Sequence, residues 1–429
     1  MAVKDARRHF PGLEGIRGIA CVAVVVNHVA VYTGVINSSL FGAQGKGMIG
    51  AIIDRSEVSM PIFFVVSAAL LFRPYVLAML EDSKSPATSP YLWRRALRIL
   101  PAYWLMTPVA LVLLNGSTIT GPWPVLRPLL FLQVYQPDAL ASGMEQTWSL
   151  PTEVAFYLLL PVFALLVGRF ARKATTVGRR AWRLQVPLVA LVVIGLGYTV
   201  YTHLPSEGPY PTQFLWLPEY VEFLAVGMIV AVLSVRAELE PSRAGLYTLA
   251  MRWPAACWGV ALVAFALSLT SIAGPNSVDY PGVSGALVTA ILYLICSGFL
   301  VAPLTVPDGD SRLVRVVVTN PVSLFLGRIS YGIFLWHLIF LDGYYKWSHT
   351  RYGTGNFWLV LPLPLFGAIA VATISYYALE LPAMRLRPRL GKAPADLSTP
   401  VPLTTPEPAL SAEPAADRPG VYTGRAAGS

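Results

Sequence analysis

Apolar segments of about 20 residues recur along most of the chain and alternate with shorter polar segments that hold most of the charges. A segment of this length is long enough to cross the hydrocarbon core of a bilayer as an α-helix. The pattern predicts an all-α, polytopic membrane bundle. Its ten expected transmembrane helices lie near residues 13–33, 57–75, 97–115, 148–168, 184–202, 218–236, 253–271, 281–303, 323–341 and 357–379.

Lys and Arg are distributed unequally between the loops on the two sides of these helices. If the first helix runs outward, the cytosolic loops and tails hold 26 Lys and Arg and the opposite loops hold 5, with Arg17 inside the first helix. By the positive-inside rule, this predicts that both termini are cytosolic. Membrane orientation then explains the net charge of +9, so we expect no nucleic-acid partner.

The composition supports a membrane protein. The chain is 55% hydrophobic and only 13% charged, where a soluble protein usually carries about 25% charged residues. All three cysteines, Cys21, Cys257 and Cys296, lie within apolar segments, so we expect neither a disulfide framework nor a metal site.

Three parts of the chain follow from these patterns: a cytosolic N-tail (1–12), a transmembrane domain (13–385) and a Pro- and Ala-rich tail (386–429) expected to be disordered. The first apolar segment is long enough to span, so we expect no cleavable signal peptide. Segment 116–147 is too short to cross and rich in Gly and Pro, which predicts a re-entrant or interfacial segment on the outer side.

Arg17 and His28 are the unusual polar residues of the first predicted helix. They lie eleven residues apart, which is close to three helical turns and roughly 16 Å of rise, so both face the same side at two depths. Charged groups near the membrane centre cost roughly 2.5–3.5 kcal/mol on insertion scales, which makes them functional candidates. The competing interpretations are a basic anchor for Arg17 and a satisfied interior residue for His28.

A cluster of arginines, Arg94, Arg95 and Arg98, opens the third predicted helix from the cytosolic side. Residues three or four apart share a helix face, so Arg98 stacks with the other two. Guanidinium groups bind phosphates bidentately, which makes the cluster a candidate phosphate site. A positive-inside anchor is the alternative.

Other polar residues lie within apolar segments. They are Ser67, Trp148, Glu153, Tyr157, Tyr331 and His337. Glu153 and Tyr157 are four apart and share a face. Interfacial aromatic belts and interhelical hydrogen bonds would account for several of them without any function.

These segments resemble, in order and spacing, the acyltransferase-3 family of membrane O-acyltransferases, over residues 11 to 385. The resemblance is carried by "LEGIRGIACVAVVVNH", "FFVVSAALLFRP", "RRALRILPAYW", "TWSLPTEVAFYLLLP", "LGRISYGIFLWH" and "SYYALELP". Glu14, Ala68 and Val154 depart from the family pattern, where aspartate, glycine and a second carboxylate are usual. Val154 leaves Glu153 as the acidic residue of its segment, and we expect no appended esterase-like domain.

The resemblance implies transfer of an acetyl or other short acyl group from cytosolic acyl-CoA to a hydroxyl of a glycolipid or envelope glycan, across a bacterial plasma membrane. Arg95, Arg98 and Arg94 would hold the donor phosphates, and Arg17 would help there or order the pantetheine arm. His28 would act as catalytic base, with Arg17 and Glu153 in support. Ser67, Trp148, Tyr157, Tyr331 and His337 are acceptor-site candidates, and Glu153 or Tyr157 is a candidate to orient His28.

Three alternatives stay open. The acceptor could be a macrolide-type small molecule. The protein could be a transporter or flippase without catalysis, which would show no dependence on coenzyme A. It could also load the acyl group onto itself, for which His28 is the obvious carrier. The sequence leaves the oligomeric state open.

Overall fold

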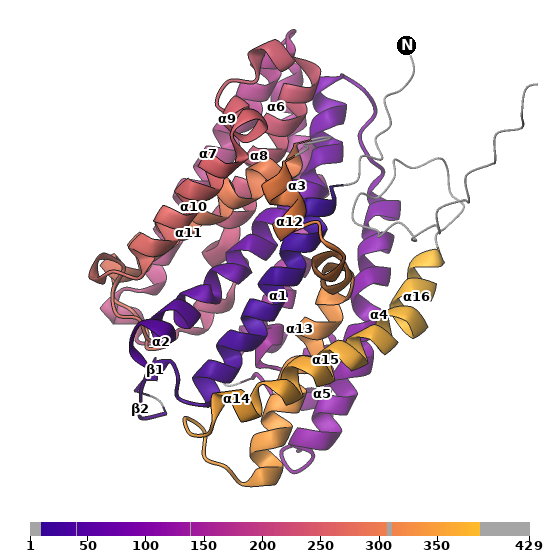
Figure 1. The fold of residues 1–429 in the computed structure, drawn as a ribbon. Coiled ribbons are helices and arrows are strands. Elements are labelled where there is room, and N and C mark those ends of the chain that lie inside the picture. Colours follow the sequence, from indigo (N-terminus) through magenta and orange to yellow (C-terminus); the bar gives the residue numbers. More distant parts are fainter. Residues whose placement is uncertain (1–9, 40, 138, 307–310, 387–429) are drawn as a thin grey trace, which may run out of the picture. The chain divides into compact units, whose positions relative to one another are not determined.

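The computed structural model describes residues 10–39, 41–137, 139–306 and 311–386. Within them the chain is a helical bundle with one two-stranded hairpin, which confirms the all-α class (Figure 1). Most of the predicted N-tail and nearly all of the predicted C-terminal tail lie outside the described residues. The elements are α1 (Pro11–Tyr32), β1 (Asn37–Ser38), β2 (Ala43–Gln44), α2 (Gly47–Asp54), η1 (Arg55–Val58), α3 (Ser59–Leu80), α4 (Thr88–Asn115), α5 (Trp123–Leu129), η2 (Gln133–Tyr135), η3 (Glu145–Trp148), α6 (Ser149–Arg172), α7 (Val177–Thr202), α8 (Val221–Leu239), α9 (Tyr247–Arg252), α10 (Pro254–Ser268), η8 (Ser271–Ala273), α11 (Val283–Val301), α12 (Arg312–Val317), α13 (Pro321–Ser348), α14 (Phe357–Val360), α15 (Pro362–Ser375), η10 (Tyr376–Glu380) and α16 (Leu381–Arg385).

Nine helical segments of the described chain are long and apolar enough to span a membrane. They match nine of the ten predicted segments. The tenth, predicted near 253–271, is α10, which has only 15 residues and packs against α11. Its shortness has a local cause, because Pro254 begins the helix and the chain turns into η8 soon after Ser268.

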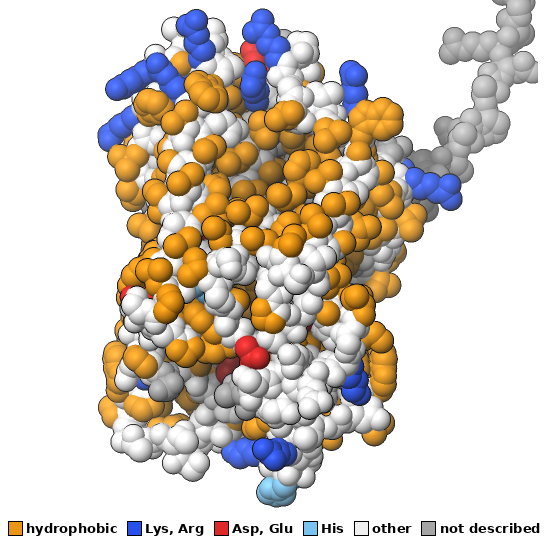
Figure 2. Space-filling model, turned by 90° about the vertical axis from the view of Figure 1, so that its left-hand side faces the viewer, with side chains coloured by type: hydrophobic (Ala, Val, Ile, Leu, Met, Phe, Trp, Pro, Cys, Tyr) orange, Lys and Arg blue, Asp and Glu red, His pale blue; other side chains and the backbone are white. Residues whose placement is uncertain are grey.

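Apolar side chains cover the middle of the visible face as a broad belt, and most Lys and Arg side chains gather beyond it at the upper end (Figure 2). We call the end of the bundle where α1 and α4 begin the arginine end, and the end that carries the β1–β2 hairpin the hairpin end (Figure 1). An apolar belt between polar ends is the expected surface of a multi-pass membrane protein.

Two apolar cores make up the interior. One is built largely from α3, α6, α7 and α8, and the other from the second half of α1 together with α4, α13 and α15. Met60, Phe63, Phe131 and Tyr331 are incompletely buried and pack against both cores. They mark a seam between the cores.

α1 and α13 pack backbone against backbone. A Cβ atom on Gly327 would lie 2.1 Å from the carbonyl oxygen of Glu14, and one on Gly18 would lie 2.6 Å from that of Ser323. Glycine at these positions permits the close approach, as is common between membrane helices. The contact fixes the relative positions of two helices that both carry candidate site residues.

The segment between α4 and α6 folds back into the bundle without crossing it. The Gln146 amide donates to the carbonyl of Leu335 (2.7 Å), which lies midway along α13, and the Gln133 amide donates to the carbonyl of Thr147 (3.2 Å). Both glutamines are buried. Irregular backbone at this depth is tolerated because it is enclosed by protein. The geometry is that of a re-entrant segment, one of the two forms expected from the sequence.

Candidate functional site

Two histidines from distant parts of the sequence meet within the bundle. Nε2 of His337, on α13, lies 3.3 Å from Nδ1 of His28, on α1, and the two ring centroids are 5.0 Å apart. His337 is completely buried, whereas His28 is only partly buried. The partial exposure of His28 leaves its ring accessible to a small molecule.

The hydrogen bonds of the pair assign the protons of both rings. Nδ1 of His337 lies 2.8 Å from the carbonyl oxygen of Phe334, and Nδ1 of His28 lies 2.9 Å from that of Val24. A carbonyl oxygen can only accept, so both Nδ1 atoms carry hydrogen when the rings are neutral. Nε2 of His337 is then an acceptor, and the single Nδ1 hydrogen of His28 is shared between it (3.3 Å) and the Val24 carbonyl (2.9 Å), which leaves Nε2 of His28 with a free lone pair. That atom is suited to act as a general base.

Arg17 lies on the same helix as His28, nearer the arginine end. Its guanidinium stands 6.0 Å from the ring centroid of Phe63, one of the seam residues. Its Nε is buried without a hydrogen-bond partner among the described residues. A buried donor without a partner is costly, so the site can gain by offering it an acceptor.

Glu153 lies among the arginines. Its carboxylate interacts electrostatically with Arg17, Arg98 and Arg95, and it accepts a hydrogen bond of 2.7 Å from the hydroxyl of Tyr157. Glu153 is only partly buried, so it borders an accessible space. The Glu153 carboxylate therefore lies close to three guanidinium groups.

The three arginines of α4 face two directions. Arg95 is buried and interacts with Glu153 and Tyr157, whereas Arg94 interacts with Tyr75. Arg98 faces both Arg17 and Glu380. The structure therefore brings Arg95 and Arg98 together with Arg17 around Glu153.

The C-terminal helix completes this cluster through a π-helical turn, η10. Ser375 donates to Glu380 over 3.2 Å, and the Glu380 carboxylate interacts with Arg98. Single π-helical turns are frequent at functional sites. The predicted "SYYALELP" segment thus contributes to the arginine cluster.

The remaining sequence candidates take different places. The Tyr331 hydroxyl donates to the carbonyl of Ile99 (2.9 Å) and its phenol ring interacts with Glu153, so it belongs with the arginine cluster. Trp148 packs on Tyr220 with 4.8 Å between centroids. Ser67 is partly buried one helical turn from Phe63.

The expected partners of His28 are different from those found. Glu153 and Tyr157 bond to each other and lie with the arginines, whereas His28 is held by His337. The structure therefore places His337 beside His28, whereas the sequence suggested it for the acceptor site. The spacing of residues on one helix cannot reveal which helix will pack against it.

Two ion pairs between charged residues were not predicted from the sequence. Arg328 Nε lies 3.2 Å from Glu14 Oε1, where both side chains are partly buried, and joins α13 to α1 near the glycine contact. Arg55, which is buried, lies beside the more exposed Glu57 in η1, just before α3. Opposite charges inside predicted helices were the available signal, but their pairing depends on the packing.

Comparison with known proteins adds to this picture. A family profile described as an acyltransferase domain, Acyl_transf_3, matches residues 10–378. The peptidoglycan O-acetyltransferase OatA of Listeria monocytogenes is 26% identical over 355 residues, which cover 77% of this chain and 49% of that relative. Acyltransferase MdmB of Streptomyces mycarofaciens is 25% identical over 400 residues, which cover 88% of this chain and 92% of that relative.

An O-acetyltransferase of Staphylococcus aureus is 22% identical over 395 residues, which cover 87% of this chain and 57% of that relative. The chain thus spans about half the length of each of these two O-acetyltransferases. No solved structure gives a significant match.

Proposed function

The chain belongs to the acyltransferase 3 family of multi-pass membrane proteins, and on that premise we propose that it transfers an acetyl or other short acyl group from cytosolic acyl-CoA to a hydroxyl group. The proposed acceptor is a glycan or glycolipid on the outer side or within the membrane. We further propose that the protein lies in a bacterial plasma membrane with both termini in the cytosol.

One observation carries the proposal: Nε2 of His28 is the free base of a hydrogen-bonded histidine pair, on the same helix as Arg17. A hydroxyl is a poor nucleophile at neutral pH, because its proton must leave as the carbonyl carbon is attacked. General base catalysis contributes about 10²–10⁴-fold to such a step.

The proposed reaction balances without an external acid or base. His28 Nε2 takes the hydroxyl proton while the acceptor oxygen forms a bond to the thioester carbon. When the tetrahedral intermediate breaks its carbon–sulfur bond, the imidazolium of His28 returns the proton to the leaving thiolate. Through the step, His337 accepts from Nδ1 of His28 and keeps the ring in the productive tautomer.

The donor phosphates suit the arginine cluster. Arg95, Arg98 and Arg17 all interact with Glu153, and Arg17 Nε lacks an acceptor in the described chain. Phosphate oxygens would supply that acceptor and balance the positive charge. The roughly 16 Å between the levels of Arg17 and His28 leaves room for an extended arm that carries the thioester.

The test is acyl transfer by the purified full chain in lipid nanodiscs, with labelled acetyl-CoA and an extract of envelope lipids and glycans. Wild type should form an ester-linked product, and His28→Ala should abolish it. Arg95→Ala should raise the KM for acetyl-CoA about tenfold or more. The KM for the acetyl thioester of N-acetylcysteamine, which lacks phosphates, should not change.

In a second version of the same assay, a macrolide is offered as the acceptor. Label on a macrolide but on no envelope component would replace the proposed acceptor. Loss of the acetyl-CoA dependence altogether, with both variants equal to wild type, would favour a transporter.

A further inference from the structure

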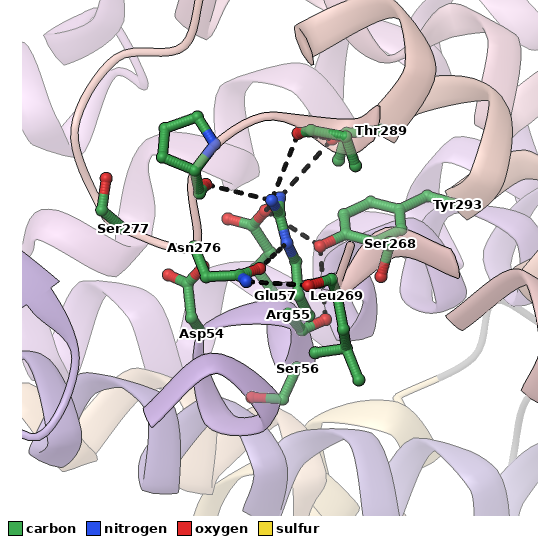
Figure 3. A network of polar contacts seen from close by, with 12 residues as sticks. Asp54, Arg55, Ser56, Glu57, Ser268, Leu269, Asn276, Ser277, Thr289 and Tyr293 are labelled. Carbon is green, nitrogen blue, oxygen red and sulfur yellow. Dashed lines mark hydrogen bonds and ion pairs between the residues drawn. The ribbon is translucent and has the colours of Figure 1, made fainter. Parts of the chain in front are cut away.

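A second buried network lies on the hairpin side of the seam, centred on Arg55 in η1 (Figure 3). The Arg55 guanidinium donates to Asn276 Oδ1 (2.9 Å) and to the carbonyls of Pro275 (3.0 Å) and Ala273 (3.2 Å). Arg55 is 5% exposed. These bonds join the start of α3 to the loop between α10 and α11 and hold Arg55 in one position.

The carboxylate of Glu57 is held by this network on one side only. Its Oε1 accepts from the hydroxyl of Tyr293 (3.0 Å) and lies 4.0 Å from a guanidinium nitrogen of Arg55 (Figure 3). Oε2 has no hydrogen-bond partner among the described residues. The Glu57 side chain is 53% exposed, so its carboxylate is accessible to a ligand.

A structural ion pair of this bundle looks different. Arg73 and Glu238 bond directly, and their side chains are 9% and 16% exposed. A salt bridge that serves only to join two helices is stabilised when both side chains are enclosed, because each charge then neutralises the other. In the Arg55–Glu57 pair, by contrast, Oε1 of Glu57 is held in place and Oε2 is left available to another donor.

Glu57 stands between the two levels of the candidate site. Glu57, Met60 and Phe63 lie on one face of the chain that begins α3, and Phe63 packs against Arg17. Toward the hairpin end, Asn27, the neighbour of His28, donates to the carbonyl of Asp54 (3.2 Å), one turn before Glu57.

An aromatic surface stands near the same carboxylate. Tyr220 interacts electrostatically with Glu57 and packs on Trp148, with 4.8 Å between the ring centroids. Trp148 is only partly buried. A few placed polar groups beside aromatic walls are typical of small-molecule sites.

We infer that Glu57 is an acceptor-binding residue, whose Oε2 accepts hydrogen bonds from the hydroxyl groups of a sugar that packs against Trp148. The inference rests on the proposed function and names its acceptor as polyhydroxylated. Arg55 already supplies the positive charge that Glu57 requires, so Oε2 is left for neutral donors such as hydroxyls. A ligand with several hydroxyls can bond to Glu57 through one and present another to His28.

The experiment uses the full chain in nanodiscs with two acceptor probes, N,N′-diacetylchitobiose and cyclohexanol. Tryptophan fluorescence measures disaccharide binding without donor, and labelled acetyl-CoA measures transfer. Glu57→Gln should raise both the Kd and the KM for the disaccharide about tenfold, because a hydrogen bond to a charged group is lost. The KM for acetyl-CoA and the rate with cyclohexanol should not change.

Two further variants keep the outcome decisive. Tyr293→Phe retains the charge of Glu57 and removes the hydroxyl that donates to it (3.0 Å) and to the carbonyl of Arg55 (3.3 Å), so it should weaken disaccharide binding about threefold even if Glu57→Gln folds poorly. Glu207→Gln, a carboxylate outside the seam bonded to Tyr201, should behave as wild type.

The inference is overturned if wild type does not bind the disaccharide, or if Glu57→Gln lowers transfer to both acceptors equally. Glu57-dependent binding without any turnover of acetyl-CoA would support the inference and overturn the proposed function. Acetyl transfer to cyclohexanol or water without disaccharide binding would support the proposed function and overturn the inference.

Discussion

The two levels of the candidate site differ in how they hold polar groups inside a membrane protein. At the level of Arg17, guanidinium groups from α1 and α4 interact with the carboxylates of Glu153 and Glu380, and Nε of Arg17 has no acceptor among the described residues. At the level of His28, each ring nitrogen that faces protein has a defined partner, and one lone pair remains. The first arrangement suits binding of an anion, and the second suits movement of a proton.

The difference shows how donor binding and proton transfer could be assigned to two levels of one helix. Binding a charged donor needs uncompensated charge, which is expensive in a membrane and is therefore best kept near one end. Proton transfer needs a neutral base in a fixed tautomer, which a buried hydrogen-bonded pair supplies.

The largest expected effect is on His28. His28→Ala should lower kcat for acyl transfer by about 10²–10⁴-fold, because the general base is lost, while the KM for acetyl-CoA stays within about twofold. Stopped assays of ester product would measure both. His349→Ala, at the exposed end of α13, is the matched control and should retain full activity. Equal loss in both variants would remove the special role of His28.

The next effect is on the contact between α1 and α13. Gly327→Ala places a Cβ atom 2.1 Å from the carbonyl of Glu14, so the helices must separate. We expect a destabilisation of about 1–3 kcal/mol, which is typical of overpacking, together with reduced transfer. Thermal unfolding in nanodiscs would measure the first.

Gly197→Ala, where a Cβ atom meets open space, should leave the melting temperature unchanged or raise it. If Gly327→Ala is as stable and active as Gly197→Ala, the close helix contact does not position the site.

His337 should matter for kcat alone. His337→Phe removes the acceptor that orients His28, so kcat should fall about tenfold with both KM values unchanged. His337→Gln keeps an accepting oxygen and should recover part of the loss. An increase in acceptor KM instead would return His337 to the acceptor site, where the sequence suggested it.

Glu153 should affect the donor rather than the chemistry. Glu153→Gln keeps the shape and removes the carboxylate from the arginine cluster, which should change the KM for acetyl-CoA about fivefold. The value of kcat should stay within about threefold. A fall in kcat of a hundredfold would instead make Glu153 a participant in catalysis, as the sequence allowed.

The smallest effect is expected outside the membrane. The hydroxyl and backbone N–H of Ser39 donate to Asp279, and these bonds hold the pKa of that carboxyl below its usual range. The stabilisation is present above the ordinary aspartate pKa of about 3.9 and is lost as the pH falls through the lowered value. Asp279→Ala should therefore cost less than about 1 kcal/mol at pH 7 and less still in acid, measured by thermal unfolding. An effect independent of pH would mean that the charge contributes nothing.

The sequence predicted the positions of most helices because each one carries its own apolar segment. It also predicted that Arg17 and His28 share a helix face, since helical spacing alone decides that. The partner of His28 could not be predicted, because His337 is 309 residues away and the pairing depends on the close contact of α1 with α13.

Glu57 shows a second limit. It stands at the polar start of α3, where a carboxylate is unremarkable in sequence. Its distinctive property is that Tyr293, Arg55 and the loop after α10 fix one oxygen and leave the other accessible. Such a property belongs to the packed bundle, and no local pattern contains it.

The glycine contact between α1 and α13 also bears on how an acceptor from one side and a donor from the other can reach one centre. Helices that meet backbone to backbone have no intervening side chains whose rotamers could change to let them slide. α1 and α13 should therefore behave as one fixed unit, which we call the stator. Any motion that admits substrates then has to come from the helices and the re-entrant segment around it. Crosslinks between α1 and α13 should be tolerated through the whole catalytic cycle, whereas crosslinks that fasten α3 or η3 to this stator should arrest it.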